Sequence, residues 1–389
     1  MSHSHHPDIH EKVYHAGDTA FSIADLLASA SDEKYMTKGL PRISDFHLKV
    51  GQAVRFRMDQ ELRSIPKGEL LTNELMRKLI LPLLPENKRE HFKEQDIFEV
   101  DTSFELDVKD GVRNRYRINA FYDNSGMAAV IRYLPPRLPL SDQLGFPYED
   151  IWKRIISLKQ GLVVVSGITG SGKSTTIACL LNLINQSRGS HIITLEEPIE
   201  YVFNSERSLV SQREVGKHTK SFATGLRAAL HEDPDIIYVG EVRDTETAAL
   251  ALTAAETGHL VFTTLHTRDA IGGILRLIDL FPPEREKEIT SQLSLSIAYV
   301  ISQKLVPRVD GAGRAVAMEV LRNTAAVGHS IRSGKLHQIY SMMETGGELS
   351  MITMEQRLID LANVGVISKE NAVYYANRDD VVDRLFPNG

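Results

Sequence analysis

A glycine-rich segment near the middle of the chain has the residue types and spacing that bind phosphate. Residues 167–174, GITGSGKS, follow an apolar run, precede a helical pattern and match G-x-x-x-x-G-K-[ST] at every fixed position. The glycines let backbone N–H groups surround phosphate oxygens, and the start of the helix adds partial positive charge. Lys173 is predicted to reach the β- and γ-phosphates of a nucleotide, and the Ser174 hydroxyl to ligate Mg²⁺. The predicted phosphate contacts are Gly167, Thr169, Gly170, Ser171, Gly172, Lys173, Ser174 and Thr175.

Acidic residues follow two later apolar runs, where they would organise a metal ion and a water molecule. Glu196, Glu197 and Glu200 end the first run, and Glu241 ends the second. Because parallel strands bring their carboxyl ends to one edge of a sheet, we expect these acids beside the phosphate loop. Ser174, Glu200 and Glu241 are predicted to hold Mg²⁺, which prefers oxygen ligands. Glu196, Glu200 and Glu241 are the predicted catalytic acids, and the pattern leaves open which of Glu196, Glu197 and Glu200 activates the water.

A third apolar run, residues 258–267, places His266 at its far end. A histidine there could donate to a γ-phosphate and respond to its loss. His259 begins the same run and would lie about 23 Å from His266 if the run is fully extended. We therefore predict that His266 acts as the sensor and that His259 does not touch the same phosphate.

Four segments organise the chain around these residues. Residues 1–20 contain His3, His5, His6, His10 and His15 without an apolar period, which predicts a disordered tail. Residues 21–133 combine a helical pattern with short alternating runs, as in a small α+β domain. Prolines then predict an extended linker over residues 134–147.

Residues 148–389 alternate strand and helix patterns, which predicts an α/β fold with a parallel sheet covered by helices on both faces. Beyond about residue 269 the pattern is mainly helical, with one further strand candidate at residues 315–321.

Composition narrows the class of protein. With 45 basic and 51 acidic residues the net charge is −6, which does not favour nucleic acid as a partner. The single cysteine, Cys179, excludes a disulfide framework and multi-cysteine zinc sites. No apolar stretch approaches the roughly 20 residues of a membrane helix, so a soluble cytoplasmic protein is expected.

Together the four motif segments resemble the Walker A, Asp box, Walker B and His box of the secretion ATPase superfamily, which drives type II and type IV secretion and type IV pili. The resemblance covers residues 21–370 and is strongest to its PilT-like branch, notably in DPDII at 233–237 and LTAAETGHLVF at 252–262.

This resemblance implies a fold, a ligand and partners. It implies a homohexameric ring at the cytoplasmic face of the inner membrane, with a PAS-like N-terminal domain, a RecA-like C-terminal domain, and ATP with Mg²⁺ at the subunit boundary. It also implies that Arg115, Arg117 and Arg132 close over the phosphates and that Arg227 adds a guanidinium from the catalytic domain, where such groups neutralise transition-state charge.

Several positions depart from the family pattern. Glu197 fills the aspartate place of the usual EDPIE box, and His231 stands where a second arginine is usual. The retraction signature AIRNLIRE is replaced by AVGHSIRS at residues 326–333, in which Gly328 and His329 suggest a different docking surface. We therefore expect a type IVB or conjugative secretion motor related to DotB.

Three alternatives remain open at this stage. The first is a pilus-retraction ATPase of the PilT type. The second is a RecA-type nucleic-acid motor, which would need basic loops. The third is a nucleotide-binding adaptor without hydrolysis, which would be expected to lack Glu200 or Glu241.

Overall fold

Two sheets, one in each of two units, organise the chain. The computed structural model describes residues 8–37, 40–59, 61–108, 113–134, 138, 144–311, 313–378 and 381. The units are Met1–Arg137 and Leu138–Gly389. The division falls inside the predicted linker of residues 134–147, of which 135–137 and 139–143 lie outside the described residues.

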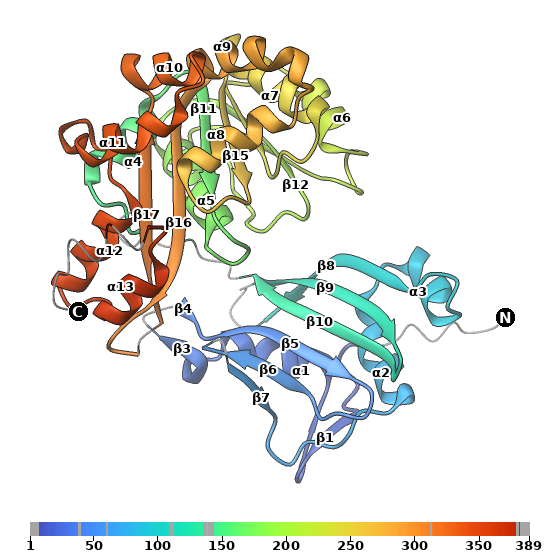
Figure 1. Ribbon diagram of the computed structural model, residues 1–389. Coiled ribbons are helices and arrows are strands. Elements are labelled where there is room, and N and C mark those ends of the chain that lie inside the picture. The colour runs from blue at the N-terminus through green and yellow to red at the C-terminus, as the bar shows by residue number, and fades with distance from the viewer. Residues whose placement is uncertain are drawn as a thin grey trace. The chain divides into compact units, whose positions relative to one another are not determined.

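An antiparallel sheet with helices on one face forms the N-terminal unit (Figure 1). Its elements are β1 (Tyr14–Ala16), β2 (Thr19–Phe21), α1 (Ile23–Ala28), η1 (Ser29–Ser31), η2 (Glu33–Tyr35), β3 (Met36–Thr37), β4 (Leu40–Pro41), β5 (Ile43–Lys49), β6 (Arg55–Met58), β7 (Glu61–Ser64), α2 (Asn73–Ile80), η3 (Leu81–Leu83), α3 (Glu86–Lys93), β8 (Glu99–Asp107), β9 (Arg113–Asp123) and β10 (Gly126–Leu134). Within the described residues the sheet has the order β7-β6-β5-β10-β9-β8. Alternation turns Phe46, Ile118 and Ile131 toward the helices, where they form one core with Leu27 and Leu79.

The predicted disordered tail of residues 1–20 includes residues that are folded. β1 and β2 pair in antiparallel register within residues 14–21. Tyr14 is fully buried, and its hydroxyl accepts a hydrogen bond from the Val54 backbone N–H at 3.1 Å. The interpretation failed because a three-residue strand held by one aromatic side chain has no period to detect. Residues 1–7 of the predicted tail lie outside the described residues.

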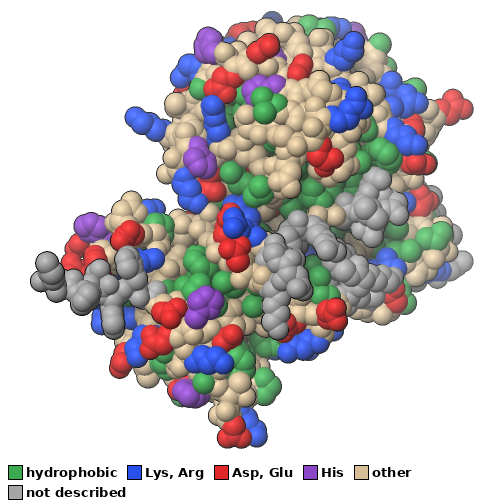
Figure 2. Space-filling view, turned by 180° about the vertical axis from the view of Figure 1, so that it is seen from behind, with side chains coloured by type: hydrophobic (Ala, Val, Ile, Leu, Met, Phe, Trp, Pro, Cys, Tyr) green, Lys and Arg blue, Asp and Glu red, His purple; other side chains and the backbone are tan. Residues whose placement is uncertain are grey.

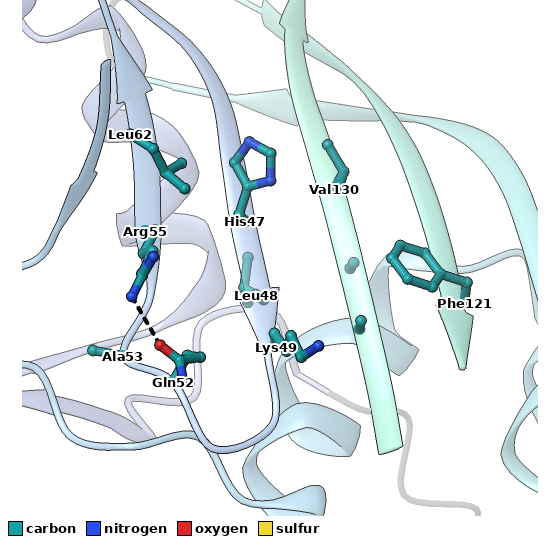
Figure 3. Close-up of a pocket in the computed structure, with 11 residues that line it drawn as sticks. His47, Leu48, Lys49, Gln52, Ala53, Arg55, Leu62, Phe121 and Val130 are labelled. Atoms are coloured by element: carbon teal, nitrogen blue, oxygen red, sulfur yellow. Dashed lines mark hydrogen bonds between the residues drawn. The ribbon is translucent and has the colours of Figure 1, made fainter. Parts of the chain in front are cut away.

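The other face of this sheet carries a hollow of about 440 Å³. Figure 3 shows Leu62, His47, Val130 and Phe121 around it, with Arg55 donating to Gln52 at 2.8 Å. Burial lowers the pKa of His47, while the charge of Asp45 acts in the opposite direction. The helix-free face is therefore mixed in polarity rather than a second core.

The second unit is an α/β domain. Its elements are α4 (Glu149–Ser157), β11 (Gly161–Ser166), α5 (Lys173–Ser187), β12 (His191–Glu196), β13 (Leu209–Glu214), α6 (Phe222–Ala229), β14 (Ile236–Val239), α7 (Thr245–Glu256), β15 (Leu260–Leu265), α8 (Ala270–Asp279), η6 (Pro283–Arg285), α9 (Glu286–Ser296), β16 (Ile297–Pro307), β17 (Arg314–Arg322), α10 (Ala325–Arg332), η7 (Leu336–Gln338), α11 (Ile339–Glu344), η8 (Gly347–Leu349), α12 (Met354–Asn363) and α13 (Lys369–Tyr375). Within the described residues the strand order is β13-β12-β14-β15-β11-β16-β17.

Helices cover both faces of this sheet, as predicted (Figure 1). Val163 and Val165 of β11 pack with α4 and α5, whereas Leu162 and Val164 pack with helices α6 to α11 on the other side. Helices α12 and α13 pack on the far ends of β16 and β17 in a separate small core. The apolar runs of the sequence therefore form strands that are buried on both faces of the sheet.

The sequence did not predict β16, and the prediction of a parallel sheet was wrong at this edge. The C-terminal part is mainly helical, as predicted, and the strand candidate at residues 315–321 is β17. β16 pairs in parallel with β11 but antiparallel with β17, so the sheet is mixed. Strand β16 begins at Ile297, directly after α9 ends at Ser296, and no glycine or proline separates them. Without a helix-breaking residue at this point, the apolar residues of the strand could not be distinguished from a continuing helix.

The surface mixes charges of both signs. Figure 2 shows basic and acidic side chains interspersed over the face in view, as expected for a net charge of −6. Among the described residues, no helix combines the length and apolar character needed to cross a bilayer.

Ile301→Ala should lower the free energy of unfolding of the second unit by about 2–5 kcal/mol, because Ile301 is fully buried between β11 and β17. Trp152, the one tryptophan, packs against the same core, so its fluorescence during urea unfolding reports on this unit. Leu295→Ala, at a side chain that is 70% exposed, is the matched control. Equal unfolding midpoints for the two variants would contradict the core placement.

Candidate nucleotide site

The phosphate loop joins β11 to α5 in a conformation that depends on glycine. Gly167, Gly170 and Gly172 have φ angles of +147°, +78° and +90°, which L side chains rarely adopt. A Cβ on Gly167 would lie 2.5 Å from both the Gln303 carbonyl oxygen and Ser171 Oγ. Gly172 also begins α5 without a capping side chain, so the first N–H groups of a 15-residue helix remain available to an anion.

Gln303 of β16 holds this loop from the neighbouring strand. Its Nε2 donates to the Ser171 carbonyl at 2.6 Å, and its Oε1 accepts from Thr176 Oγ1 at 3.0 Å. The sequence interpretation missed Gln303 because it missed β16, and no motif marks this residue.

Lys173 is almost completely buried, and its ammonium lies within the loop itself. Nζ donates to the carbonyls of Gly167 at 2.9 Å and Ile168 at 3.1 Å. Burial lowers the pKa of Lys173, while the charges of Glu241 and Glu200 act in the opposite direction. The structure thus places the predicted lysine and these two predicted acids in one electrostatic group.

Two tyrosines, Tyr201 and the buried Tyr238, hold the hydroxyl groups at the start of α5. Tyr201 Oη lies 2.9 Å from Thr175 Oγ1, and Tyr238 of β14 hydrogen bonds with Ser174. Burial raises the pKa of Tyr201 to about 12, so its hydroxyl stays protonated. Neither tyrosine was predicted. Tyr238 lies in an apolar run with the pattern of an ordinary buried strand, and Tyr201 lies in the loop after β12, where no pattern marks it.

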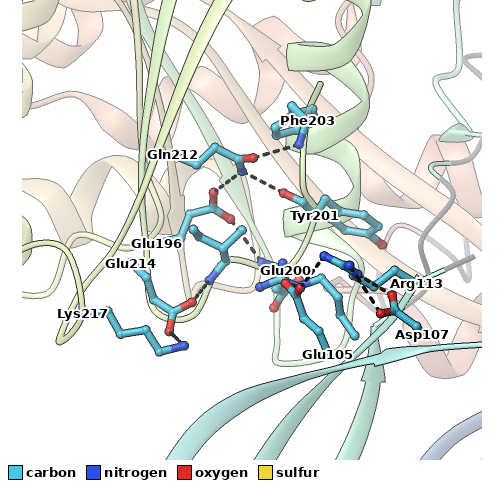
Figure 4. Close-up of polar contacts among 12 residues, drawn as sticks. Glu105, Asp107, Arg113, Glu196, Glu200, Tyr201, Phe203, Gln212, Glu214 and Lys217 are labelled. Carbon is cyan, nitrogen blue, oxygen red and sulfur yellow. Dashed lines mark hydrogen bonds and ion pairs between the residues drawn. The ribbon is translucent and has the colours of Figure 1, made fainter. Parts of the chain in front are cut away.

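Glu196, at the end of β12, is buried in a cage of donors (Figure 4). Its carboxylate accepts from Thr194 Oγ1 at 2.7 Å, Gln212 Nε2 at 3.2 Å and the Glu200 N–H at 3.4 Å. Burial outweighs these donors and raises its pKa to about 7. The same glutamine supports the chain beyond the strand through Tyr201 and Phe203. Glu196 therefore shapes the turn that carries Glu200.

Glu241 and His266 lie together at the ends of β14 and β15. These strands are parallel neighbours, and His266 Nε2 is 3.5 Å from Glu241 Oε1. Burial and the charge of Lys173 lower the pKa of His266, against the opposing charge of Glu241, so the imidazole is neutral at pH 7. A neutral imidazole can donate one hydrogen bond.

Arg243 also reaches Glu241, which the sequence interpretation did not foresee. Arg243 Nη2 lies 2.7 Å from Glu241 Oε2, and Nη1 lies 3.3 Å from Glu197 Oε2. Burial alone would raise the pKa of Glu241, but Arg243, with His266 and Lys173, lowers it below its usual value. Glu241 is therefore ionised at neutral pH. The signal that could have identified Arg243 is its place two residues after a strand-end acid.

The three predicted arginines of the N-terminal unit lie on the helix-free face of its sheet. Arg115 and Arg117 lie two residues apart on β9 and therefore share one face of the sheet. Arg132 of β10 lies directly opposite Arg117. Each positive charge is compensated by its own carboxylate. The nitrogen-to-oxygen distances are 3.1 Å for Arg115 and Glu105, 2.5 Å for Arg117 and Asp101, and 2.9 Å for Arg132 and Asp45. They form a cationic row on one face, each with an acid beside it.

The remaining predicted positions lie outside this cluster of contacts. Arg227 of α6 pairs with Glu246 in the first turn of α7. His259 directly precedes β15, and its Nδ1 is 3.0 Å from the Ala254 carbonyl oxygen near the end of α7. As predicted, it stands at the opposite end of the strand from His266.

The donors of the cluster fit a nucleotide with Mg²⁺. Ser171 Oγ is buried without a hydrogen-bond partner among the described residues, in a loop whose helix end is uncapped. Among those residues, no group of three His, Cys, Asp or Glu is arranged to hold a metal. One or two carboxylates with Ser174 and phosphate oxygens is the donor set typical of Mg²⁺, which would neutralise phosphate charge when bound.

A P-loop at the carboxyl edge of a sheet with strand-end acids defines a nucleotide-binding P-loop protein. The family model of type II/IV secretion system proteins matches residues 40–382, and the chain belongs to this family. It is 45% identical to the type IV pilus retraction ATPase PilT of Pseudomonas aeruginosa over 329 residues, 85% of this chain and 93% of that protein. The chain is therefore an ATPase of the PilT-like group.

Two solved structures show the same fold. The pilus retraction motor PilT with bound ADP has a TM-score of 0.80 at 40% identity, covering 93% of this chain and 99% of that one. The ATPase DotB of Legionella pneumophila has a TM-score of 0.74 at 29% identity, covering 85% and 91%.

These similarities overturn the prediction of a type IVB or conjugative motor. The chain shares more sequence with PilT, 40–45%, than with DotB, 29%. The structure also removes Gly328 from the argument for a different docking surface on α10, although His329 is exposed. Gly328 is buried rather than exposed, and a Cβ there would lie 3.1 Å from the Ser294 carbonyl oxygen of α9. Glycine at this position permits close helix packing.

Glu241→Gln should still bind ATP but hydrolyse it about 10²-fold or more slowly, because the amide keeps the volume and loses the charge. Lys173→Ala is the comparison, expected to lose both binding and turnover. Equilibrium nucleotide binding and phosphate release measure the two effects. Turnover in Glu241→Gln close to that of the wild type would contradict the assignment.

Glu196→Gln should change the pH dependence of stability. The pKa of Glu196 is about 7 in the folded protein against an ordinary value of 4.5, so between these pH values the folded state holds a proton that the unfolded state has lost. This group therefore lowers stability as pH rises from 4.5 to 7. The melting temperature of the variant relative to wild type should rise between pH 5 and pH 8. A constant difference would contradict the burial of an ionisable carboxyl.

Proposed function

We propose that this protein is the ATP-driven motor that retracts type IV pili. The observation that carries the proposal is the 45% identity to a pilus retraction ATPase over 93% of that protein's length. A second relative, a twitching motility protein of Neisseria gonorrhoeae, is 43% identical over 316 residues. The cluster of Lys173, Glu200, Glu241 and His266 supports ATP hydrolysis as its chemistry.

In this proposal ATP binds with Mg²⁺, held by Ser174, Glu200 and Glu241. The deep burial of Glu196 inside its donor cage favours Glu200, which is half-buried on the turn above, as the acid that activates water. His266 responds to the γ-phosphate. The motor acts at the cytoplasmic face of the inner membrane through the pilus machinery.

The motor works as a six-membered ring. Arg115, Arg117 and Arg132 close over phosphate, and their existing partners support this role. Glu105, Asp101 and Asp45 keep the three guanidinium groups extended on one face, ready to exchange a carboxylate for a phosphate. Arg227 exchanges the Glu246 carboxylate for a phosphate in the same way.

Deleting the gene in its host should give hyperpiliated cells that do not twitch, with normal export of effectors and normal plasmid transfer. Wild-type protein should restore twitching, and the Lys173→Ala variant at equal abundance should not. Microscopy of pili and a surface-motility assay measure the outcome. Normal twitching together with lost export would refute retraction as the function.

Light scattering should show a particle of six 43.5 kDa chains when ATP is present. Glu241→Gln protein is suited to the measurement because it keeps ATP intact. Monomers alone at micromolar concentration with ATP would refute the ring.

A further inference from the structure

One guanidinium bridges the ends of two strands at the nucleotide site. Arg243 contacts Glu241 after β14 at 2.7 Å and Glu197 after β12 at 3.3 Å, each through a different nitrogen. The Arg243 side chain is 61% exposed, whereas that of Glu241 is 20% exposed. The arginine is therefore the more exposed partner of this pair.

Both oxygens of Glu241 already have protein partners. Oε2 faces Arg243, and Oε1 faces the neutral His266 at 3.5 Å. A divalent cation that binds Glu241 through Oε2 approaches the oxygen that the guanidinium occupies. Two cations on one oxygen repel each other strongly at a half-buried site, so the metal and Arg243 exclude each other there.

Glu197 offers the guanidinium a second partner. It is 45% exposed and already contacts the other terminal nitrogen of Arg243. It also stands where the family pattern has aspartate, and its extra methylene extends the carboxylate toward the arginine. Transfer of Arg243 from Glu241 to Glu197 needs only a change in side-chain rotamer.

We propose that Arg243 is a positioning residue that acts as a displaceable counter-ion of Glu241. Before the metal binds, Arg243 holds this carboxylate in place. When Mg²⁺ arrives with the nucleotide, Arg243 moves to Glu197. The inference rests on the proposed magnesium role of Glu241.

Mn²⁺ binding to the full chain with saturating ADP, followed by electron paramagnetic resonance, tests the proposal. Arg243→Gln should bind Mn²⁺ roughly two- to fivefold more tightly, the size expected for removing one partly exposed ion pair. ADP affinity in EDTA should not change. Glu197→Gln should bind Mn²⁺ more weakly, because Arg243 then stays on Glu241. Arg285→Gln, which breaks an exposed pair with Glu288, is the matched control.

The double variant Arg243→Gln/Glu197→Gln separates displacement from simple charge effects. Displacement predicts that Glu197→Gln has no effect once Arg243 is absent, whereas independent charges would give additive changes. Unchanged or weaker Mn²⁺ binding in Arg243→Gln would overturn the proposal, as would additivity. Weaker ADP binding in EDTA would also overturn it, because the arginine would then contact phosphate.

Glu241→Gln is measured in parallel. If it binds Mn²⁺ as the wild type does, the magnesium role of Glu241 is refuted. If it loses Mn²⁺ while Arg243→Gln is unchanged, only displacement is refuted.

Discussion

Parallel pairing of neighbouring strands is the constraint on which the nucleotide site depends. β12, β14, β15 and β11 run in the same direction in adjacent positions, so their carboxyl ends meet at one edge. Each strand then delivers one group: Glu196 with the turn to Glu200, Glu241, His266 and the phosphate loop. No long-range movement is needed to assemble these groups, because backbone hydrogen bonding fixes their spacing.

Charge balance then sets the chemical state of each group. Lys173 and two carboxylates lie in a partly buried cluster, where interactions between charges are stronger than in water. Arg243 and Lys173 keep Glu241 ionised, while burial and Lys173 keep His266 neutral. The same environment that favours the carboxylate as a metal ligand thus leaves the histidine as an uncharged donor.

The N-terminal unit follows a different principle, because its functional candidates lie on an exposed sheet face. Arginines directly opposite each other on neighbouring strands are tolerated since each has its own acid. The Arg117–Asp101 pair is exposed, and such a pair contributes little to stability, about 0–1 kcal/mol. Asp45, the partner of Arg132, and most of the Arg115 side chain are buried. The partner of Arg117 is therefore exchangeable, which suits a residue proposed to move onto phosphate.

The sequence by itself determined the phosphate loop, the acids at the strand ends, His266 and the α/β class, because each follows from a local pattern of strand, loop and helix. It did not determine Gln303 or Arg243. Gln303 meets the loop carbonyl of Ser171 across 132 residues, and Arg243 meets Glu197 across 46, contacts that exist only once the strand order is formed.

The orientation of Gly328 was also decided only by tertiary packing. A glycine in a short helix has no pattern that separates a solvent face from a helix contact, and the contact with α9 makes it a packing residue. Local residue types thus determined which chemistry is present. Strand order and helix packing decided which side chains support it, because those contacts join residues that lie far apart along the chain.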